Sequence, residues 1–178
     1  ESLSYSRCSE RSFSHGPQSS FPQEHWLRRS QDPSQLMQVR QFGVPQGVYM
    51  ERPGAYVVVL RPDLHMAAVR VRDVYHLPGG GIDNGETPGQ AATREVSEET
   101  GLTVVALRFL GRANQFYPHT RTGPMNKLGW MFLGRVGTQK GRKIEDDHHL
   151  VWMPMAAFIA LPAAGFQKWA VQEATLYV

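Results

Sequence analysis

The sequence predicts one mixed α/β domain in which helices cover a sheet. Three observations predict it. The chain has 178 residues, 41% of them apolar, which is enough for one buried core. Apolar runs at strand spacing lie on both sides of a single well-capped helix, and an apolar stripe at helical spacing follows near the C-terminus. Strands before and after a central helix, with a second helix last, are typical of a layered α/β domain.

The first part of the chain differs in composition from the rest. Residues 1–41 are rich in serine, poor in apolar residues and show no period of 2 or 3.6. We therefore expect residues 1–41 to form a disordered or loosely attached tail, in which His25-Trp26-Leu27 could dock locally. The domain is expected to occupy residues 42–178.

Strands are expected wherever short apolar or alternating runs end at turn residues. These runs are 55–60, 66–72, 75–77, 104–112, 128–136 and 150–153. Near the C-terminus Phe166, Trp169, Ala170 and Tyr177 recur at helical spacing. This stripe favours a helix that packs on the core, rather than a ligand site.

The central helix carries clear signals at both ends. Thr87 can cap its N-terminus, Pro88 suits the first helical position, and Gln90 completes a capping box. Gly101 supplies the left-handed residue that commonly follows a helix, so the helix should end at Thr100.

This helix gathers acidic side chains on one face. At ~100° per residue, Glu95, Glu98 and Glu99 share one arc, with Arg94 beside Glu98. Like charges ~4 Å apart repel by roughly 4 kcal/mol at an effective dielectric of 20, and a hard divalent cation would relieve that repulsion. Oxygen ligands favour Mg²⁺ or Mn²⁺, and the glycines at 79–81 let a backbone carbonyl approach. A surface helix with ordinary charges is the simpler alternative.

The spacing from Gly80 to Leu102 is the sharpest motif in the chain. It runs as Gly80, five residues, Glu86, seven residues, then Arg94-Glu95-Val96-Ser97-Glu98-Glu99-Thr100-Gly101-Leu102. This stretch resembles the complete box of the Nudix hydrolase family, in its MutT-like branch. The resemblance implies an α/β/α sandwich around a mixed sheet. It also implies Mg²⁺-dependent attack of water on a nucleoside diphosphate linked to another moiety.

The resemblance also implies roles for the box residues. The implied metal ligands are a carbonyl at Gly79 or Gly80 and the carboxylates Glu95, Glu98 and Glu99. Arg94 and Glu86 would orient and neutralise this set. The general base would be a box glutamate or an acid from a later loop.

An acidic cluster in the second half of the chain could supply that later acid. It is Glu145-Asp146-Asp147, and we favour Glu145 because the preceding Ile144 could anchor it inward. A solvated turn is the alternative. His148 and His149 next to it are interpreted as polar turn residues.

Substrate contacts are predicted from two strands. Arg70 and Arg72 point to one side of the strand before the box and could hold phosphates, or simply face solvent. Asn114, Phe116 and Tyr117 could read or stack on a base, although core packing explains both rings equally well.

The expected function is hydrolysis of a nucleoside triphosphate or related nucleotide derivative, as in cleansing of the nucleotide pool. Alternatives are an ADP-ribose or dinucleoside polyphosphate pyrophosphatase, or a non-enzymatic nucleotide sensor. A net charge of +3 does not indicate a nucleic-acid partner. No apolar run approaches the ~18 residues of a membrane helix, and the single cysteine, Cys8, suits a reducing cytoplasm.

Overall fold

The computed structural model describes residues 38–45 and 47–178. The predicted tail, including the tripeptide that begins at His25, lies almost entirely outside these residues. The described elements, in chain order, are β1 Val39–Phe42, β2 Met50–Leu60, β3 His65–Val71, β4 Val74–His76, β5 Gly79–Gly81, α2 Pro88–Thr100, β6 Leu102–Tyr117, β7 Met125–Lys140, β8 His149–Pro154, α3 Met155–Ala160, α4 Gly165–Ala174 and the 3₁₀ turn Thr175–Tyr177. No helix among them is long and apolar enough to cross a membrane.

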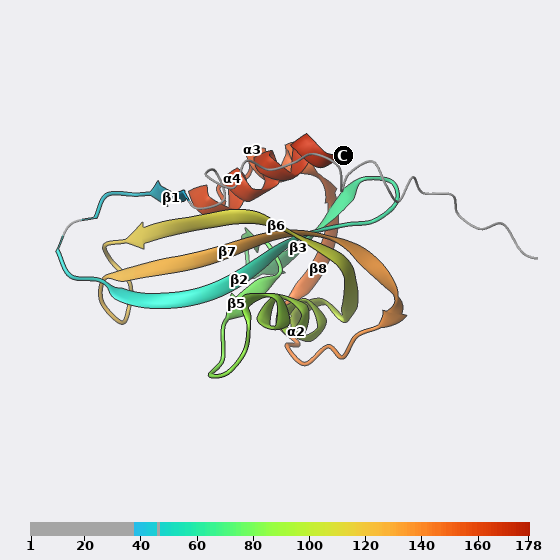
Figure 1. Ribbon diagram of the computed structural model, residues 1–178, viewed down its shortest axis with the longest axis horizontal. Coiled ribbons are helices and arrows are strands. Elements are labelled where there is room, and N and C mark those ends of the chain that lie inside the picture. Colours follow the sequence, from blue (N-terminus) through green and yellow to red (C-terminus); the bar gives the residue numbers. More distant parts are fainter. Residues whose placement is uncertain (1–37, 46) are drawn as a thin grey trace, which may run out of the picture.

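The strands form one mixed sheet in the order β1-β6-β7-β2-β3-β4, with β5 paired to β2 and β8 to β3. At its centre β2 runs parallel to β7, in register from the Met50–Met125 pair to the Leu60–Arg135 pair. Helix α2 covers one face of the sheet, and α3 and α4 cover the other (Figure 1). The predicted α/β/α sandwich around a mixed sheet is therefore confirmed.

The domain has two hydrophobic cores, one on each face of the sheet, and strand β2 contributes to both. Residues 55–60 are all at most 5% exposed, so this strand is buried on both faces. Its side chains alternate between a cluster under α4, which includes Tyr56 and Phe166, and a cluster under α2, which includes Val57 and Val96. The apolar stripe predicted near the C-terminus packs in the first of these clusters.

Helix α2 begins and ends as its sequence predicts. The hydroxyl of Thr87 accepts from the backbone N–H of Gln90, and the Gln90 side chain accepts from the backbone N–H of Thr87. Pro88 occupies the first turn, and Gly101 closes the helix with φ +72°. Local hydrogen bonds and a left-handed glycine therefore define where the helix begins and ends.

The sheet extends beyond the expected strands. It begins at Val39, three residues before the predicted domain boundary, because residues 39–42 pair in parallel with β6. The β6–β7 hairpin is also longer than the apolar runs suggest, since ladder hydrogen bonds continue through polar residues to Tyr117 and Met125. The glycines at 79–81, which are not among the expected strands, form strand β5 and pair with β2.

The approach of β5 to β2 leaves no room for a side chain at Gly79. Its φ is +142°, and a Cβ there would collide with the Ala55 carbonyl oxygen and lie 2.6 Å from the Tyr56 Cα. The outward-facing Gly81 has nothing within 4 Å of such a Cβ. Glycine at 79 is therefore required both by its backbone angles and by close packing.

We expect Gly79→Ala to lower the free energy of unfolding by at least about 2 kcal/mol, because strain and overpacking add at this position. Gly81→Ala is the matched control and should change it by less than about 0.5 kcal/mol. Urea denaturation followed by circular dichroism measures both. Equal effects in the two variants would contradict the close approach of β5 to β2.

Candidate active site

The site begins where β5 meets α2. Register with β2 places Gly80 opposite Ala55, directly beneath the helix. A Cβ at Gly80 would lie 2.6 Å from the carboxylate carbon of Glu95, so this carboxylate occupies the space that a side chain would fill. The structure thus brings the Gly80 backbone and the Glu95 carboxylate together, while the carbonyl ligand that the sequence suggests at Gly79 or Gly80 stays a prediction.

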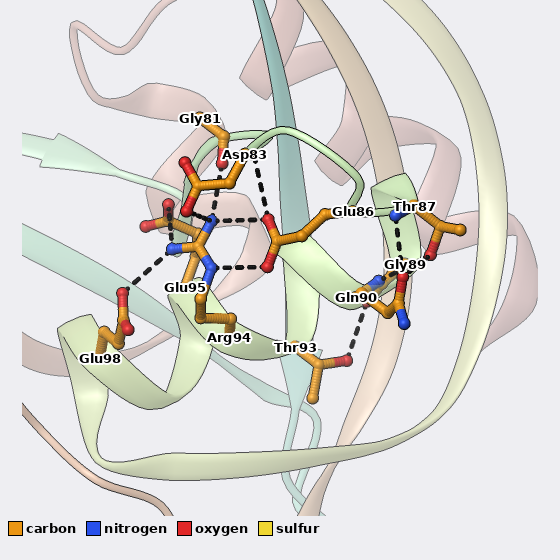
Figure 2. A network of polar contacts seen from close by, with 10 residues as sticks. All are labelled: Gly81, Asp83, Glu86, Thr87, Gly89, Gln90, Thr93, Arg94, Glu95 and Glu98. Atoms are coloured by element: carbon orange, nitrogen blue, oxygen red, sulfur yellow. Dashed lines mark hydrogen bonds and ion pairs between the residues drawn. The ribbon is translucent and has the colours of Figure 1, made fainter.

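Arg94 organises the acidic face of α2 (Figure 2). Its Nε and one terminal nitrogen bind the two oxygens of Glu86 at 2.8 and 3.0 Å. The other terminal nitrogen donates to Glu95 at 2.9 Å and to Glu98 at 3.1 Å. The remaining N–H donates to the Gly81 carbonyl at 2.9 Å, so all five guanidinium donors are used within the box.

The charges around Arg94 stabilise one another. Hydrogen bonds from Arg94 lower the pKa of Glu86 to about 2, and the Glu86 carboxylate in turn raises the pKa of Arg94. Asp83 adds a longer ion pair of 3.7 Å. Because every donor of Arg94 is used, this side chain holds Glu86, Glu95 and Glu98 in fixed positions relative to one another.

Glu95 and Glu99 are the buried carboxylates of the face, 8% and 7% exposed. Burial raises the pKa of both, and that of Glu99 reaches about 8, with the nearby Glu95 and Glu145 also raising it. The backbone N–H of Gly79 donates to Glu99 at 2.9 Å and partly offsets the shift. Glu98 is more open, with 28% of its side chain exposed.

The loop between β7 and β8 meets the end of α2. The backbone N–H groups of Ile144 and Glu145 both donate to the Glu98 carbonyl, at 2.8 and 3.2 Å. Ile144 itself is 53% exposed, so the prediction that its side chain anchors Glu145 inward is wrong. Main-chain hydrogen bonds to the helix terminus anchor the loop instead.

His148 joins this loop to the box. Its Nδ1 lies 2.9 Å from carboxylate oxygens of Glu145 and Asp147, and its Nε2 lies 3.4 Å from Glu99. Asp146 is exposed. The interpretation of His148 as a turn residue therefore misses its position between the two acidic groups.

The side chains at this point fit a divalent cation. Ligand atoms of Glu99, Glu145 and His148 lie within 4.8 Å of one another. Glu95 and Glu98 flank them on the same helix but are held by Arg94. A set dominated by carboxylate oxygens, with one imidazole nitrogen, suits Mg²⁺ or Mn²⁺ better than a thiolate-seeking metal.

A cavity of about 300 Å³ opens beside these ligands. Its lining is Tyr56, Val69, Val71, His76, Gly79, Glu99, Lys127, His148 and Gln167. Gln167 is 2% exposed, and its side-chain carbonyl oxygen accepts from the Leu77 backbone N–H at 3.1 Å. Cavities of roughly 300 to 1,000 Å³ with a few polar groups are the usual size for small-molecule sites.

The residues predicted to contact the substrate are not among those that line this cavity, although Tyr117 lies near enough to the cavity residue Tyr56 to raise its pKa, and their role in substrate binding stays a prediction. Arg70 and Arg72 are on β3 and in the turn after it, and neither lines the cavity. Asn114, Phe116 and Tyr117 are within β6 and do not line it either. The Phe116 ring packs edge-on against Tyr49 at 5.2 Å.

Sequence reasoning missed Lys127, His76 and Gln167. Lys127 lies at the polar start of a strand and His76 on a strand of three residues. In such segments the alternation of apolar and polar residues does not indicate which side chains face inward. Gln167 gave a usable signal, since it follows Phe166 on the apolar side of a helix where a polar residue needs a partner.

The raised pKa of Glu99 predicts a pH-dependent stability. Between its ordinary value of 4.5 and about 8, folded Glu99 keeps a proton that the unfolded chain releases. The free energy of unfolding therefore falls as pH rises through this window. In chelator, we expect the melting temperature of the wild type to drop between about pH 5 and pH 8 relative to Glu99→Gln.

Circular dichroism melts at several pH values give this difference directly, and Glu51→Gln, a change at an exposed strand residue, is the control. Subtracting the curve of Glu99→Gln from that of the wild type removes the contribution of groups that titrate alike in these two proteins. One such group is His76, whose pKa is lowered by burial. Parallel curves for wild type and Glu99→Gln would show that Glu99 ionises without cost.

Comparison with known proteins agrees with this geometry. A family model of the NUDIX domain matches residues 50–173. An RNA pyrophosphohydrolase of Caulobacter vibrioides is 34% identical over 116 residues, covering 56% of this chain and 66% of that protein. The NAD-capped RNA hydrolase NudC of Pseudomonas aeruginosa is 34% identical over 141 residues, covering 76% of this chain and 47% of NudC. The chain thus spans less than two thirds of either relative.

A solved structure shows the same fold. The MutT NUDIX hydrolase from Burkholderia pseudomallei aligns with a TM-score of 0.56 at 21% identity, over 70% of this chain and 98% of that one. The family model, the fold and the box at the junction of β5 and α2 all agree, and the chain belongs to the Nudix family.

Proposed function

We propose that the protein is a Mg²⁺- or Mn²⁺-dependent hydrolase of a phosphoanhydride bond in a nucleoside triphosphate or related nucleotide derivative. One observation carries the proposal. Ligand atoms of Glu99 of α2, the loop acid Glu145 and His148 lie within 4.8 Å of one another, and Glu99 and His148 also line a cavity of small-molecule size. If the phosphate chain of a substrate lies at the carboxylates, the cavity remains available for the group attached to that chain.

The residues divide the work of the reaction between them. Glu99, Glu145 and His148 would hold the cation, together with Glu95, Glu98 and the Gly80 carbonyl. When bound, the cation supplies charge neutralisation on the phosphate oxygens and activation of the attacking water. Water attacks phosphorus, the anhydride P–O bond breaks, and the leaving phosphate departs with the bonding electron pair.

A carboxylate must take the proton that the water loses. Glu95, Glu98 and Glu145 are the candidates, and Arg94 holds two of them at fixed positions. Glu145 lies 2.9 Å from the His148 ring nitrogen, so its carboxylate is also oriented, and among the described residues it has no guanidinium partner. Its position beside Glu99 and His148 in the ligand cluster, with no guanidinium across its oxygens, favours Glu145.

The substrate is proposed from the cavity and from the relatives. Aromatic, aliphatic and amide groups line the cavity, which suits a nucleoside better than a purely ionic group. The relative from Caulobacter is named an RNA pyrophosphohydrolase and the one from Pseudomonas an NAD-capped RNA hydrolase, so a nucleotide at the 5′ end of RNA is the second candidate substrate. A role in cleansing the nucleotide pool, in the cytoplasm, fits the first candidate.

A substrate panel tests the proposal. Purified protein with Mg²⁺ or Mn²⁺ is assayed for phosphate and pyrophosphate release from nucleoside triphosphates and oxidised forms, ADP-ribose and dinucleoside polyphosphates. RNA with a 5′-triphosphate or NAD cap completes the panel. Hydrolysis of at least one member supports the enzyme. Binding without turnover across the panel would favour a nucleotide sensor instead.

Loss of either acidic ligand should abolish most of the turnover. We expect Glu98→Gln and Glu99→Gln each to lower kcat by at least ~100-fold, because charge stabilisation by the cation is worth several kcal/mol. Chelator should abolish activity, and added Mg²⁺ or Mn²⁺ should restore it. Steady-state kinetics with a folding check by circular dichroism measures this, and Glu51→Gln is the control. Near-normal turnover in both variants would refute the metal assignment.

The three loop acids can be separated by single amides. If Glu145 is the base, Glu145→Gln should lower kcat more than it raises KM, because a base acts in the transition state. Asp146→Asn, at an exposed position, serves as the matched control, and Asp147→Asn should have an intermediate effect through His148. Effects under about threefold in all three variants would return the role to Glu95 or Glu98.

A further inference from the structure

Lys127 is a basic side chain turned into the cavity. It lies near the start of β7, in register with Arg52 of β2 and Gln115 of β6. It lies two positions before Gly129 and four before the core residue Met131, so strand alternation puts its side chain on the face that α4 covers. Lys127 therefore shares the cavity with Gln167 on one side and Glu99 on the other.

The surroundings of Lys127 provide little compensation for its charge. Its residue is half-buried, and within residues 38–45 and 47–178 the structure gives its ammonium neither a hydrogen bond nor an ion pair. The titratable groups that line the cavity with it are Tyr56, His76, Glu99 and His148. Burial lowers the pKa of Lys127, and the more distant charge of Glu99 only partly offsets this.

A charged ammonium at this position costs free energy unless a ligand supplies a partner for its charge. A buried cation without a partner loses hydration that nothing replaces. Glu99 is also a proposed metal ligand, so its charge is committed to the cation. Phosphate oxygens are the chemical groups that would be attracted to both the cation and the ammonium. A lysine suits this task because its compact charge binds phosphate from many directions.

We propose that the Lys127 ammonium binds an oxygen of the phosphate that stays on the nucleoside, and so makes the cavity a site for a nucleoside 5′-phosphate. The inference rests on the proposed function and names the half of the substrate that enters the cavity. Lys127 is then a residue that positions substrate rather than one that transfers a proton. Because this phosphate is present in both substrate and product, Lys127 should stabilise substrate, transition state and product alike.

Product binding tests this directly. Calorimetry compares adenosine, guanosine, cytidine and uridine with their 5′-monophosphates, in the presence of Mg²⁺, for the full chain. Wild type should bind at least one monophosphate about ten- to a hundredfold more tightly than its nucleoside, the range for a hydrogen bond to a charged group. Lys127→Gln should reduce this preference to under about threefold, while Lys127→Arg should retain part of it.

Lys140→Gln is the matched control, since it removes the same charge from the exposed end of the same strand. It should keep the wild-type preference. In kinetics, Lys127→Gln should raise KM by about the factor lost in product affinity and leave kcat within about threefold. Lys127→Met keeps the apolar stem and provides a second variant, with melting curves to show that both are folded.

The outcomes separate this inference from the proposed function. If wild type hydrolyses nucleotides but Lys127→Gln keeps the preference for monophosphates, the inference is wrong and the function stands. An equal loss of affinity for nucleosides and monophosphates would also overturn it, because Lys127 would then only shape the cavity. If wild type hydrolyses no nucleotide in the panel, the proposed function itself fails.

Discussion

The acidic face of α2 depends on one guanidinium. Glu86, Glu95 and Glu98 would repel one another across a few ångströms, and Arg94 holds all three with directed hydrogen bonds. Its last donor reaches the Gly81 carbonyl, so the same side chain ties the helix to β5. This leaves Glu99, at the far end of the face and beyond the reach of Arg94, to meet the loop histidine and the cavity.

The acidic face of α2 lies beside the cavity because β2 pairs with three other strands and is covered by helices on both faces. Strand β2 pairs with β7 along its length, with β5 at residues 54–56 in its middle, and with β3 at its C-terminal end. Its two sides carry the two cores, and the glycines of β5 let α2 come close enough for Gly79 to bind Glu99. The cavity is lined by residues from helices on both sides of the sheet, Gln167 from α4 and Glu99 from α2.

The sequence predicts the parts of the site that are local and misses those that are not. The α2 caps, the arc of carboxylates and the Arg94–Glu98 contact all follow from spacing along one helix, and the structure has them. The residues that line the cavity come from strands and a helix far apart in the chain, so no local period marks them. Ile144 shows where reasoning from residue type fails. Its apolar side chain suggests burial, but it is exposed, and main-chain hydrogen bonds hold the loop instead.

The parallel pairing of β2 with β7 also affects how the chain is synthesised and folded. Their register joins Met50 to Met125 and Leu60 to Arg135, so helix α2 and the glycine strand both lie within the connection between two partner strands. Such distant contacts form late and slowly, because the long loop must close first. On a ribosome, α2 can form as soon as it emerges, yet its acidic face cannot meet Glu145 and His148 until β7 and the following loop have left the exit tunnel. During that interval the nascent chain exposes the apolar residues of β2, and transiently exposed apolar surface of this kind favours aggregation.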